Sequence, residues 1–337
     1  MGEREGNRRI LLARRPTGIP EVSDFAMDDA LVPTLEDGEF LIRNRFLSVD
    51  PAQRGWATDA ANYTNTVPLG GVMRALAVGL IIESRHPDFP VGSHAYGWFG
   101  WQEVAVAGPP DVLTLFARPE VSLSAYAGIL GINGLTAWLA FHRLGRPNAG
   151  ESVLVSTAAG AVGSIVGQLA SASGCRVVGL TGSDAKANLC RTRFGYDVAL
   201  NYKSVALDSQ LAEASPDGFD IFFDNVGGST LDTGLRQMRV GGRVVQCGTA
   251  SIPSWTPPPQ GIRNEREVLT RRLSWNGFVI FDHKSLFDET MDELVAMIRS
   301  GRLTYDEDIR SGIEAAPQAL ADVYSGRNTG KTLIALA

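Results

Sequence analysis

The feature that most restricts the fold of this chain is a strand that runs into a glycine turn and then a helix. Ser152–Ser156 is apolar enough for a buried strand, and Ala161–Ser171 places its apolar side chains on one helix face. Between them, Gly160 would let the backbone approach a pyrophosphate, and Gly163 would let the helix pack closely on the strand. A helix N-terminus also offers free N–H groups to phosphates. The segment predicts a dinucleotide-binding turn, with Ala158 in place of the usual first glycine. A tight turn without a cofactor is the alternative.

Strands and helices alternate from Ser152 onward, which predicts a Rossmann-type, doubly wound parallel sheet in an α/β protein. The expected strands are Ser152–Ser156, Arg176–Thr181, Asp220–Phe223 and Arg243–Gly248, with Phe278–Phe281 as a further candidate. The expected helices are Ala161–Ser171, Asp184–Arg193, Thr230–Arg239 and Ser285–Ser300.

The first part of the chain, to about residue 125, reads instead as a compact β-rich domain. Its strand-like runs include Arg9–Ala13, Glu39–Leu47, Ala77–Ser84 and Gln102–Ala107, and a mostly helical stretch follows over 123–144. Near the C-terminus, Ser311 and Glu314 have capping-box spacing, which predicts a helix to about Tyr324. The apolar run Thr332–Ala335 is then expected to return as a strand to the sheet of the first domain.

The end of the second strand in the alternating region distinguishes NADH from NADPH. NADH sites place Asp or Glu there for the ribose 2′-OH, whereas this strand ends in Thr181-Gly182. Ser183 can donate a hydrogen bond to a 2′-phosphate, Lys186 can supply charge, and Asn201-Tyr202-Lys203 could close the same pocket. These residues favour NADPH. Two alternatives stay open: Asp184 turning toward a 2′-OH rather than capping a helix, and the two lysines being solvated surface charges.

Composition excludes several classes of function for this 337-residue chain, whose length suggests two domains. The net charge of −6 disfavours a nucleic-acid surface, which needs a basic patch. Three scattered cysteines (Cys175, Cys190, Cys247) and four histidines form no close ligand cluster, so we expect neither a disulfide framework nor a metal site. The chain contains no long apolar run and no apolar leader at its first residues, so we expect a cytoplasmic protein that does not cross a membrane.

Several segments in this order resemble the medium-chain dehydrogenase/reductase superfamily, and within it the zinc-independent leukotriene B4 dehydrogenase/prostaglandin reductase group, over nearly the whole chain. The segments that carry the resemblance are Leu47–Gly55, Ser84–Phe89, Gly100–Glu103, Gly134–Ala137, Ala158–Gly163, Gly182–Lys186, Phe223–Gly228 and Gly326–Lys331. Zinc alcohol dehydrogenases of the superfamily carry cysteine ligands and a GHE segment. This chain has no cysteine before Cys175, and it has Gly70-Gly71-Val72 in the corresponding region.

The resemblance implies a GroES-like β-rich domain over 1–127 plus 300–337, a Rossmann domain over 128–299, an active site between them, and a homodimer. It also implies a set of cofactor contacts. Lys186, Tyr202, Gly182 and Ser183 would surround the 2′-phosphate, and Gly160, Ala161, Val162 and Gly163 the pyrophosphate. Asn225, Cys247, Gly248, Phe278, Val279, Ile280 and Asn328 would lie along the nicotinamide half, and Thr136 would be a further cofactor contact.

The chemistry implied is reduction of a C=C bond conjugated to a carbonyl in a small enone or enal substrate. Hydride would reach the β-carbon, an enolate would form, and a proton would reach the α-carbon. The group has tyrosines at two positions where this chain has Ala52 and Pro253, and proline cannot donate a proton. The expected substrate pocket includes Gln53, Pro253 and Trp255.

The missing proton source has several candidates: the loop residue Tyr63, Gln53, a ribose hydroxyl of the cofactor, and water. Tyr63 could equally be a surface tyrosine. Trp56, Trp255 and Trp275 could form an aromatic pocket wall or, more commonly for tryptophan, pack in the core. Two other functions stay open, namely quinone or carbonyl reduction on the same scaffold and NADPH binding without turnover.

Overall fold

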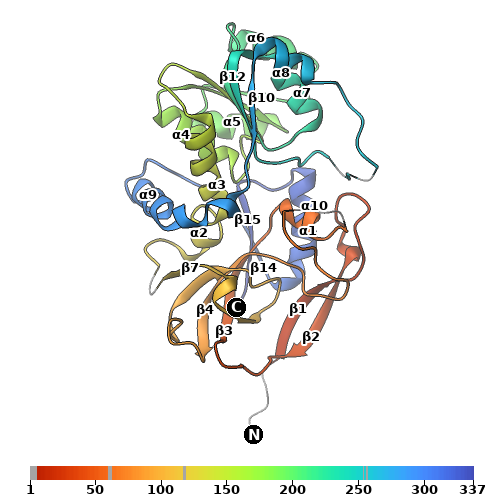
Figure 1. The fold of residues 1–337 in the computed structure, drawn as a ribbon, viewed down its shortest axis with the longest axis vertical. Helices are drawn as coiled ribbons and strands as arrows, with labels where there is room; N and C mark the ends of the chain where they lie inside the picture. The colour runs from red at the N-terminus through yellow and green to blue at the C-terminus, as the bar shows by residue number, and fades with distance from the viewer. Residues whose placement is uncertain (1–5, 60–62, 117–118, 253, 256) are drawn as a thin grey trace. The chain divides into compact units, whose positions relative to one another are not determined.

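The computed structural model describes residues 6–59, 63–116, 119–252, 254–255 and 257–337. The chain forms two compact units (Figure 1). Unit 1 comprises Met1–Gly131 and Glu307–Ala337, and unit 2 comprises Ile132–Asp306. The domain ranges expected from the sequence stay a prediction.

Unit 2 is built on a six-stranded parallel sheet with the order β10-β9-β8-β11-β12-β13. This is the Rossmann order, in which the chain starts at a central strand, proceeds to one edge, and then returns to fill the other half. The doubly wound parallel sheet is therefore confirmed. The strands are β8 (Ser152–Ser156), β9 (Arg176–Thr181), β10 (Val198–Asn201), β11 (Phe219–Asp224), β12 (Met238–Gln246) and β13 (Ser274–Gly277).

Helices cover both faces of this sheet, with α4 on one side and α7 and α8 on the other (Figure 1). The central strands are buried on both faces, so β8 and β11 read as continuous apolar runs. The helices of unit 2 are α3 (Ile132–Ala140), α4 (Gly163–Ala172), α5 (Asp184–Arg193), α6 (Leu207–Ala214), α7 (Gly228–Arg236), α8 (Glu265–Arg271) and α9 (Phe287–Arg299).

Unit 1 contains a sheet with the path β14-β15-β3-β4-β5-β7, with β6 paired to β3, and a separate hairpin of β1 and β2. Strand β15 pairs antiparallel with β3, which confirms that the C-terminal tail returns to the first sheet. The strands are β1 (Gly6–Leu12), β2 (Phe25–Leu31), β3 (Phe40–Ser48), β4 (Ala77–Ser84), β5 (His94–Gly97), β6 (Val104–Ala107), β7 (Val112–Phe116), β14 (Glu307–Ser311) and β15 (Lys331–Ala335). The helices are α1 (Ala52–Trp56), α2 (Leu123–Ala127) and α10 (Ala316–Ser325).

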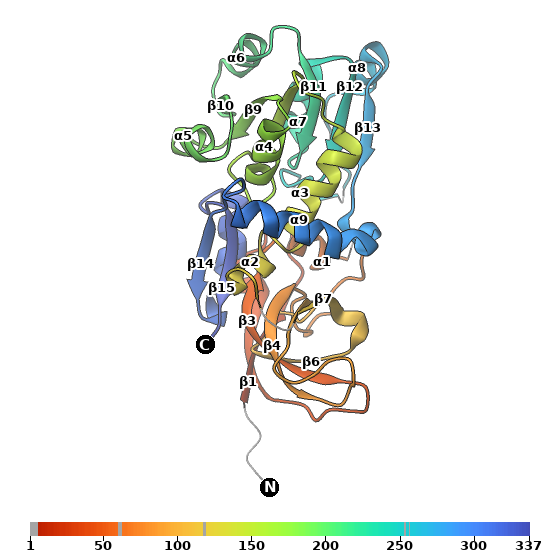
Figure 2. The same cartoon turned by 90° about the vertical axis from the view of Figure 1, so that its left-hand side faces the viewer.

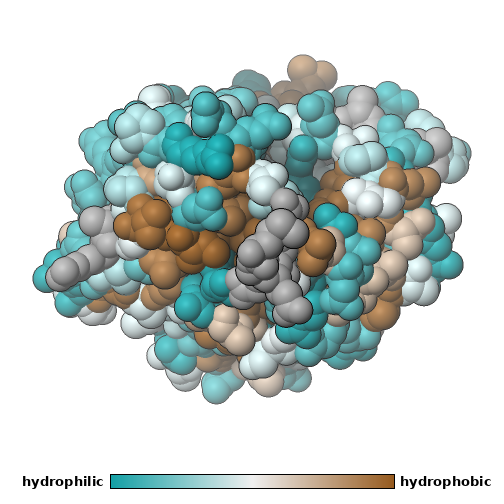
Figure 3. Space-filling view, turned by 90° about the horizontal axis from the view of Figure 1, so that it is seen from below, coloured by the Kyte–Doolittle hydropathy of each residue, from teal (hydrophilic) through white to brown (hydrophobic). Residues whose placement is uncertain are grey.

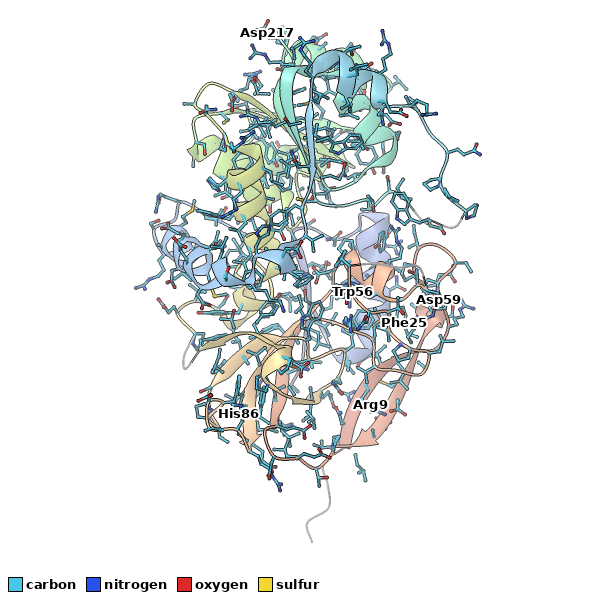
Figure 4. The ribbon with its side chains drawn as sticks, viewed as in Figure 1. Arg9, Phe25, Trp56, Asp59, His86 and Asp217 are labelled. Carbon is cyan, nitrogen blue, oxygen red and sulfur yellow. The ribbon has the colours of Figure 1, made fainter. Side chains whose placement is uncertain are left out.

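The core of unit 1 is rich in aromatic side chains. Trp56 and Trp101 are both fully buried, and Trp56 packs edge-on against Trp98 with ring centroids 5.2 Å apart. Figure 4 shows Trp56 in the interior of this unit and Asp59 toward its surface. Figure 2 gives a second view of the strands that surround this core. Trp56 is thus a core residue rather than part of a pocket wall.

The structure corrects four details of the sequence analysis. The edge strand is Ser274–Gly277, not Phe278–Phe281, because it is defined by pairing with β12 and carries no apolar pattern of its own. The helix expected over Thr230–Arg239 ends at Arg236, and β12 begins at Met238. Ser311 does not cap a helix, since it ends β14 and pairs with Ala335. Finally, Ser183, not Asp184, is the N-cap of α5.

The surface is mixed in character. On the face shown in Figure 3, hydrophilic residues surround smaller groups of apolar ones, which is usual because polar atoms cannot cover a whole protein. Within the part of the chain that the structure describes, every helix is too short or too polar to traverse a bilayer.

Candidate functional site

The turn after β8 brings the start of α4 very close to the strand end. Thr157 has a positive φ of 53°, and its carbonyl accepts a hydrogen bond from Gly160 N at 2.8 Å. A Cβ placed on Gly163 would lie only 2.3 Å from that carbonyl oxygen, so this position requires glycine. The N-cap residue Val162 provides no side-chain cap for the first turn of α4. Ser164 N and Ile165 N already donate to Gly160 O and Val162 O, so an anion would meet the backbone that precedes them, where the glycines form a cradle that larger residues would fill.

Near the end of β9 lie a lysine from the first turn of α5 and a Tyr-Lys pair that follows β10; Tyr202 N donates to Thr181 O, the last residue of β9, at 2.9 Å. Ser183 caps α5 by accepting from Lys186 N at 3.3 Å, and the Lys203 ammonium lies 5.8 Å from the Tyr202 ring centroid. Burial lowers the pKa of Lys186, and the nearby charge of Lys203 lowers it further. Two ammonium groups that repel each other make a corner that favours an anion. A Cβ on Gly182 would sit 3.4 Å from Tyr202, so the predicted residues Gly182, Ser183, Lys186 and Tyr202 do lie together.

Asp184 binds the residue at the end of β10. Its side chain is the first acidic group of α5 and accepts a hydrogen bond from Asn201 Nδ2 at 3.1 Å. This bond fixes the segment that carries Tyr202 and Lys203 beside the start of α5. Asp184 therefore helps to build the cationic corner.

The carboxyl ends of β8, β11 and β12 meet at a network around Asp224. Its carboxylate accepts hydrogen bonds from Ser156 Oγ at 2.7 Å, Gln246 Nε2 at 2.7 Å and Gly227 N at 2.8 Å. Asn225, predicted to line the nicotinamide half, donates through Nδ2 to Ser156 O at 3.1 Å. Burial raises the pKa of Asp224, while these hydrogen bonds oppose the rise.

Two more predicted residues adjoin the same network. Cys247 N donates to Asp224 O at 2.8 Å, and Gly248 O accepts from Gln246 Nε2 at 2.6 Å. Burial, together with the charge of Asp224, raises the pKa of the Cys247 thiol well above its usual range. Cys247 is therefore a neutral thiol at physiological pH and not a nucleophile.

The segment after β13 is tied back to the sheet. Phe278 N donates to Gln246 O at 3.0 Å, and the Phe278 ring stacks on His283 with centroids 4.8 Å apart. Val279 precedes the short 3-10 segment that begins at Ile280. Phe278, Val279 and Ile280 thus follow the sheet edge in the order predicted. Thr136 lies on α3 of unit 2, whereas Asn328 belongs to unit 1 and donates to Gly330 O at 3.2 Å.

The candidate residues for the proton source belong to unit 1 and differ sharply in environment. Gln53 is fully buried, and its amide is engaged by the backbone: Oε1 accepts from Asp50 N at 2.9 Å and Nε2 donates to Arg74 O at 3.0 Å. Tyr63 is 53% exposed. Desolvation and the Asp50 carboxylate raise the pKa of the Tyr63 hydroxyl, and a contact with the Trp56 side chain opposes them. The Tyr63 hydroxyl keeps its proton at neutral pH.

The remaining substrate-side predictions lie in unit 2. Pro253 falls outside the described residues. Trp255 is 55% exposed, and Trp275 is 41% exposed with its indole N–H donating to Gln246 Oε1 at 3.2 Å. Neither of these two tryptophans is a core residue, in contrast to Trp56.

Sequence reasoning missed two groups that organise these sites. Ser156, Asp224 and Gln246 end three neighbouring strands, and only that shared edge position could have brought them together from the sequence. The second group is the buried ion pair between Lys331 Nζ and Asp50 Oδ1, 2.6 Å apart. Its members are 281 positions apart, so nothing local signals the pair.

The described residues contain no group of three or more His, Cys, Asp or Glu side chains that could hold a metal ion. They do fit a dinucleotide. The glycine cradle at α4, the Lys186–Lys203 corner at the end of β9 and the loops after β11 and β12 all follow the carboxyl ends of the strands, where such ligands bind in open α/β sheets.

Comparison with known proteins places the chain in a family. Residues 8–115 match the N-terminal domain of oxidoreductases, and residues 161–298 match the family described as zinc-binding dehydrogenases. The NADP(+)-dependent 2-alkenal reductase of Nicotiana tabacum is 36% identical over 99% of this chain and 98% of its own length. The chain belongs to the zinc-independent medium-chain dehydrogenase/reductase family, in the group of the 2-alkenal and prostaglandin reductases.

Other members of the family are similar over comparable lengths. The NADPH-dependent curcumin reductase of Escherichia coli is 34% identical over 99% of this chain and 98% of its own. Prostaglandin reductase 1 of Bos taurus is 34% identical over 96% and 97%. The crystal structure of CurA from Vibrio vulnificus in complex with NADPH superposes with a TM-score of 0.92 at 32% identity, covering 98% of this chain and 99% of that one. The family expected from the sequence is confirmed.

Proposed function

We propose that this protein is an NADPH-dependent reductase of the C=C bond in α,β-unsaturated ketones or aldehydes. The observation that carries the cofactor choice is the corner at the end of β9, where Lys186 and Lys203 lie beside Tyr202 and the strand ends without an acid. The C=C assignment rests on relatives named for that chemistry, including 2-alkenal reductase, (+)-pulegone reductase and prostaglandin reductase 1.

In this proposal the cofactor, when bound, supplies the hydride that reduces the β-carbon. Lys186, Tyr202 and Ser183 hold the 2′-phosphate, and the cradle of Gly160, Ala161, Val162 and Gly163 holds the pyrophosphate. Asn225, Cys247, Gly248 and the segment Phe278–Ile280 line the nicotinamide half. These contacts orient the cofactor before the reaction, which is the main contribution a protein makes to such chemistry.

Tyr63 is the side chain best suited to deliver the proton that completes the reduction. The Tyr63 residue is about half-exposed, and its hydroxyl is protonated at neutral pH, as for an ordinary tyrosine, with desolvation and Asp50 raising its pKa further. The Gln53 amide is already engaged by two backbone groups, so Gln53 serves the local fold. A hydrogen-bond donor close to an enolate oxygen stabilises it, and a tyrosine can also transfer the proton.

The test is the loss of NADPH absorbance with three acceptors: a simple enone, a quinone and a saturated aldehyde, each repeated with NADH. We expect turnover of the enone with NADPH, and product analysis should show the saturated ketone. Turnover of the quinone or the saturated aldehyde in place of the enone would reassign the chemistry. NADPH binding with no turnover across a broad acceptor panel would identify a non-catalytic binding protein.

Two further properties are proposed. We infer a homodimer, because β13 is the outer strand of its sheet and its residues are exposed, so a second copy can pair with it. Light scattering coupled to gel filtration would test this. We also propose a cytoplasmic location, because all three cysteines are free thiols, as in a reducing compartment. Cell fractionation would test that.

A further inference from the structure

The carboxylate of Asp224 is fully buried and accepts hydrogen bonds from four groups. Oδ1 accepts from Ser156 Oγ at 2.7 Å and Val226 N at 3.1 Å, and Oδ2 accepts from Gly227 N at 2.8 Å and Gln246 Nε2 at 2.7 Å. Among the described residues, no Lys, Arg or His forms an ion pair with it, since the cations of unit 2 pair with other carboxylates, such as Arg239 with Asp220 and Arg243 with Glu151.

The arrangement of these donors favours an ionised carboxylate. Ser156 Oγ accepts from Asn225 N at 2.8 Å and lies 2.7 Å from Asp224 Oδ1, so its hydrogen is free to be donated to Asp224. Gln246 Oε1 accepts from Trp275 Nε1 at 3.2 Å, so its amide N–H₂ faces Asp224. The other two partners are backbone N–H groups. A proton on Oδ2 would face two N–H donors, and a proton on Oδ1 would replace the hydrogen bond from Ser156, so the hydrogen-bond network favours the negatively charged carboxylate.

A buried charge without a counter-ion is costly for a fold, so its position calls for an explanation. Asp224 lies where three loops meet: the one after Ser156, the one that begins at Asn225 and the one that begins at Cys247. The second and third of these are the loops expected to line the nicotinamide half. With the nicotinamide half in the place proposed above, this charge would lie close to the part of the cofactor whose own charge changes during the reaction.

We propose that Asp224 is an electrostatic positioning residue, which stabilises the positive charge that appears on the nicotinamide ring when hydride leaves. This inference rests on the proposed function. The overall reaction is enone plus NADPH plus a proton giving saturated ketone plus NADP+. The C–H bond of the dihydronicotinamide breaks, the new C–H bond forms at the β-carbon, and the α-carbon takes its proton from Tyr63 or water. Asp224 exchanges no proton; it acts through its charge and through the loops it holds.

The proposal predicts that Asp224 changes the relative affinities of the protein for NADP+ and NADPH, which a purely structural role would not do. An anion near the ring favours NADP+ over NADPH. Two unit charges about 10 Å apart at an effective dielectric constant of about 20 interact strongly enough to change an equilibrium by roughly tenfold. Asp224→Asn should therefore raise the ratio of the Kd for NADP+ to the Kd for NADPH by about tenfold, whatever it does to both affinities together.

The experiment measures both dissociation constants by calorimetry for the full-length protein, Asp224→Asn, Asp224→Glu and Ser156→Ala. Ser156→Ala disturbs the same network but keeps the charge, so its ratio should match that of the unmodified protein. Asp224→Glu also keeps the charge and should restore the ratio. A ratio for Asp224→Asn within about twofold of the unmodified value, with both forms still bound, overturns the proposal.

Asp224→Asn places an amide against donors and can fail to fold. Gln246→Lys then decides the matter, because an ammonium at that position neutralises Asp224 without removing it. Gln246→Lys should also raise the ratio of the Kd for NADP+ to the Kd for NADPH, and an unchanged ratio overturns the proposal. The result is separable from the proposed function. A shifted ratio in a protein that reduces no enone supports the role of Asp224 and refutes the catalytic proposal, whereas a protein that binds neither cofactor refutes both.

Discussion

Replacing Lys331 with methionine should destabilise unit 1 more than any surface substitution. Lys331 and Asp50 are 5% and 3% exposed, and their charged atoms lie 2.6 Å apart. Lys331 Nζ also donates to Val49 O at 2.8 Å, and Ser48 Oγ donates to the second carboxylate oxygen of Asp50. The pair joins β15, near the C-terminus, to the segment between β3 and α1. Methionine fills a similar volume but removes the cation that faces the buried Asp50 carboxylate.

Removal of one member of a buried ion pair costs about 3–5 kcal/mol, mostly because the other charge remains desolvated. For a unit of this size, 1 kcal/mol moves the melting temperature by about 2–4 °C. The expected decrease is therefore about 6–20 °C. The double variant Lys331→Met/Asp50→Asn should recover at least half of the loss, because the uncompensated charge is gone.

Differential scanning calorimetry is the appropriate assay, because two units can melt separately and a single-wavelength melt would hide this. Only the transition of unit 1 should move to a lower temperature, and the transition of unit 2 should stay where it is. Lys284→Met, at an exposed lysine, is the matched control and should leave both transitions in place. A melting temperature for Lys331→Met within about 2 °C of the unmodified protein would refute the reasoning, as would a double variant less stable than the single one.

Three further outcomes follow from the structure. Lys186→Ala should lower the preference for NADPH over NADH in kcat/KM by at least about tenfold, since it removes one ammonium from the phosphate corner; equal use of both cofactors by the unmodified protein would contradict this. Tyr63→Phe should lower kcat for an enone by about 100-fold or more with little change in cofactor Kd, and an unchanged kcat would remove Tyr63 from the mechanism. Burial alone would raise the pKa of Asp322, but hydrogen bonds from Arg327, Arg310 and Gln318 outweigh it and lower the pKa to about 2. The stability this contributes, at most about 2.4 kcal/mol, is complete above pH 4 and is lost as the pH falls toward 2. Denaturation curves of Asp322→Asn and the unmodified protein should therefore converge in acid, and parallel curves down to pH 2 would count against the ion pairs.

The sequence predicted the strands and helices that would carry the cofactor contacts well because the signals there are local. Ser152–Ser156 and Arg176–Thr181 have the bounds that the structure shows, since a strand buried on both faces must be apolar throughout. Ser183 and Lys186 fall three residues apart at a helix start, so one short segment brings cap and cation together. Gly163 is recognisable for the same reason: the turn and the helix that need it are adjacent in the chain.

Other parts of the fold depend on residues that are far apart in sequence. Strand β13, Ser274–Gly277, is polar and exposed, and only its pairing with β12 makes it a strand. Strand β14, Glu307–Ser311, is equally polar and exists because β15 pairs beside it. The Asp50–Lys331 pair and the Asp224 network have no local pattern either. Charge burial of this kind is a tertiary property, and it becomes visible only when the strand order is known.

The contrast between Gln53 and Tyr63 shows why a family resemblance transfers the cofactor more readily than the acceptor. The family has tyrosines at the positions that Ala52 and Pro253 occupy here. Gln53 and Tyr63 are the polar side chains proposed to take their place. Gln53 is held by Asp50 N and Arg74 O, and its burial ties the segment after β3 to the strand that follows. Its conversion into a substrate contact would cost the fold two buried hydrogen bonds. Tyr63 lies on a loop and is 53% exposed, and loop residues vary more readily than buried ones. The proposed cofactor contacts lie at the glycine turn and at strand ends that the fold itself positions, whereas the proposed proton donor is a loop side chain, and the positions that depart from the group, Ala52 and Pro253, are on the acceptor side.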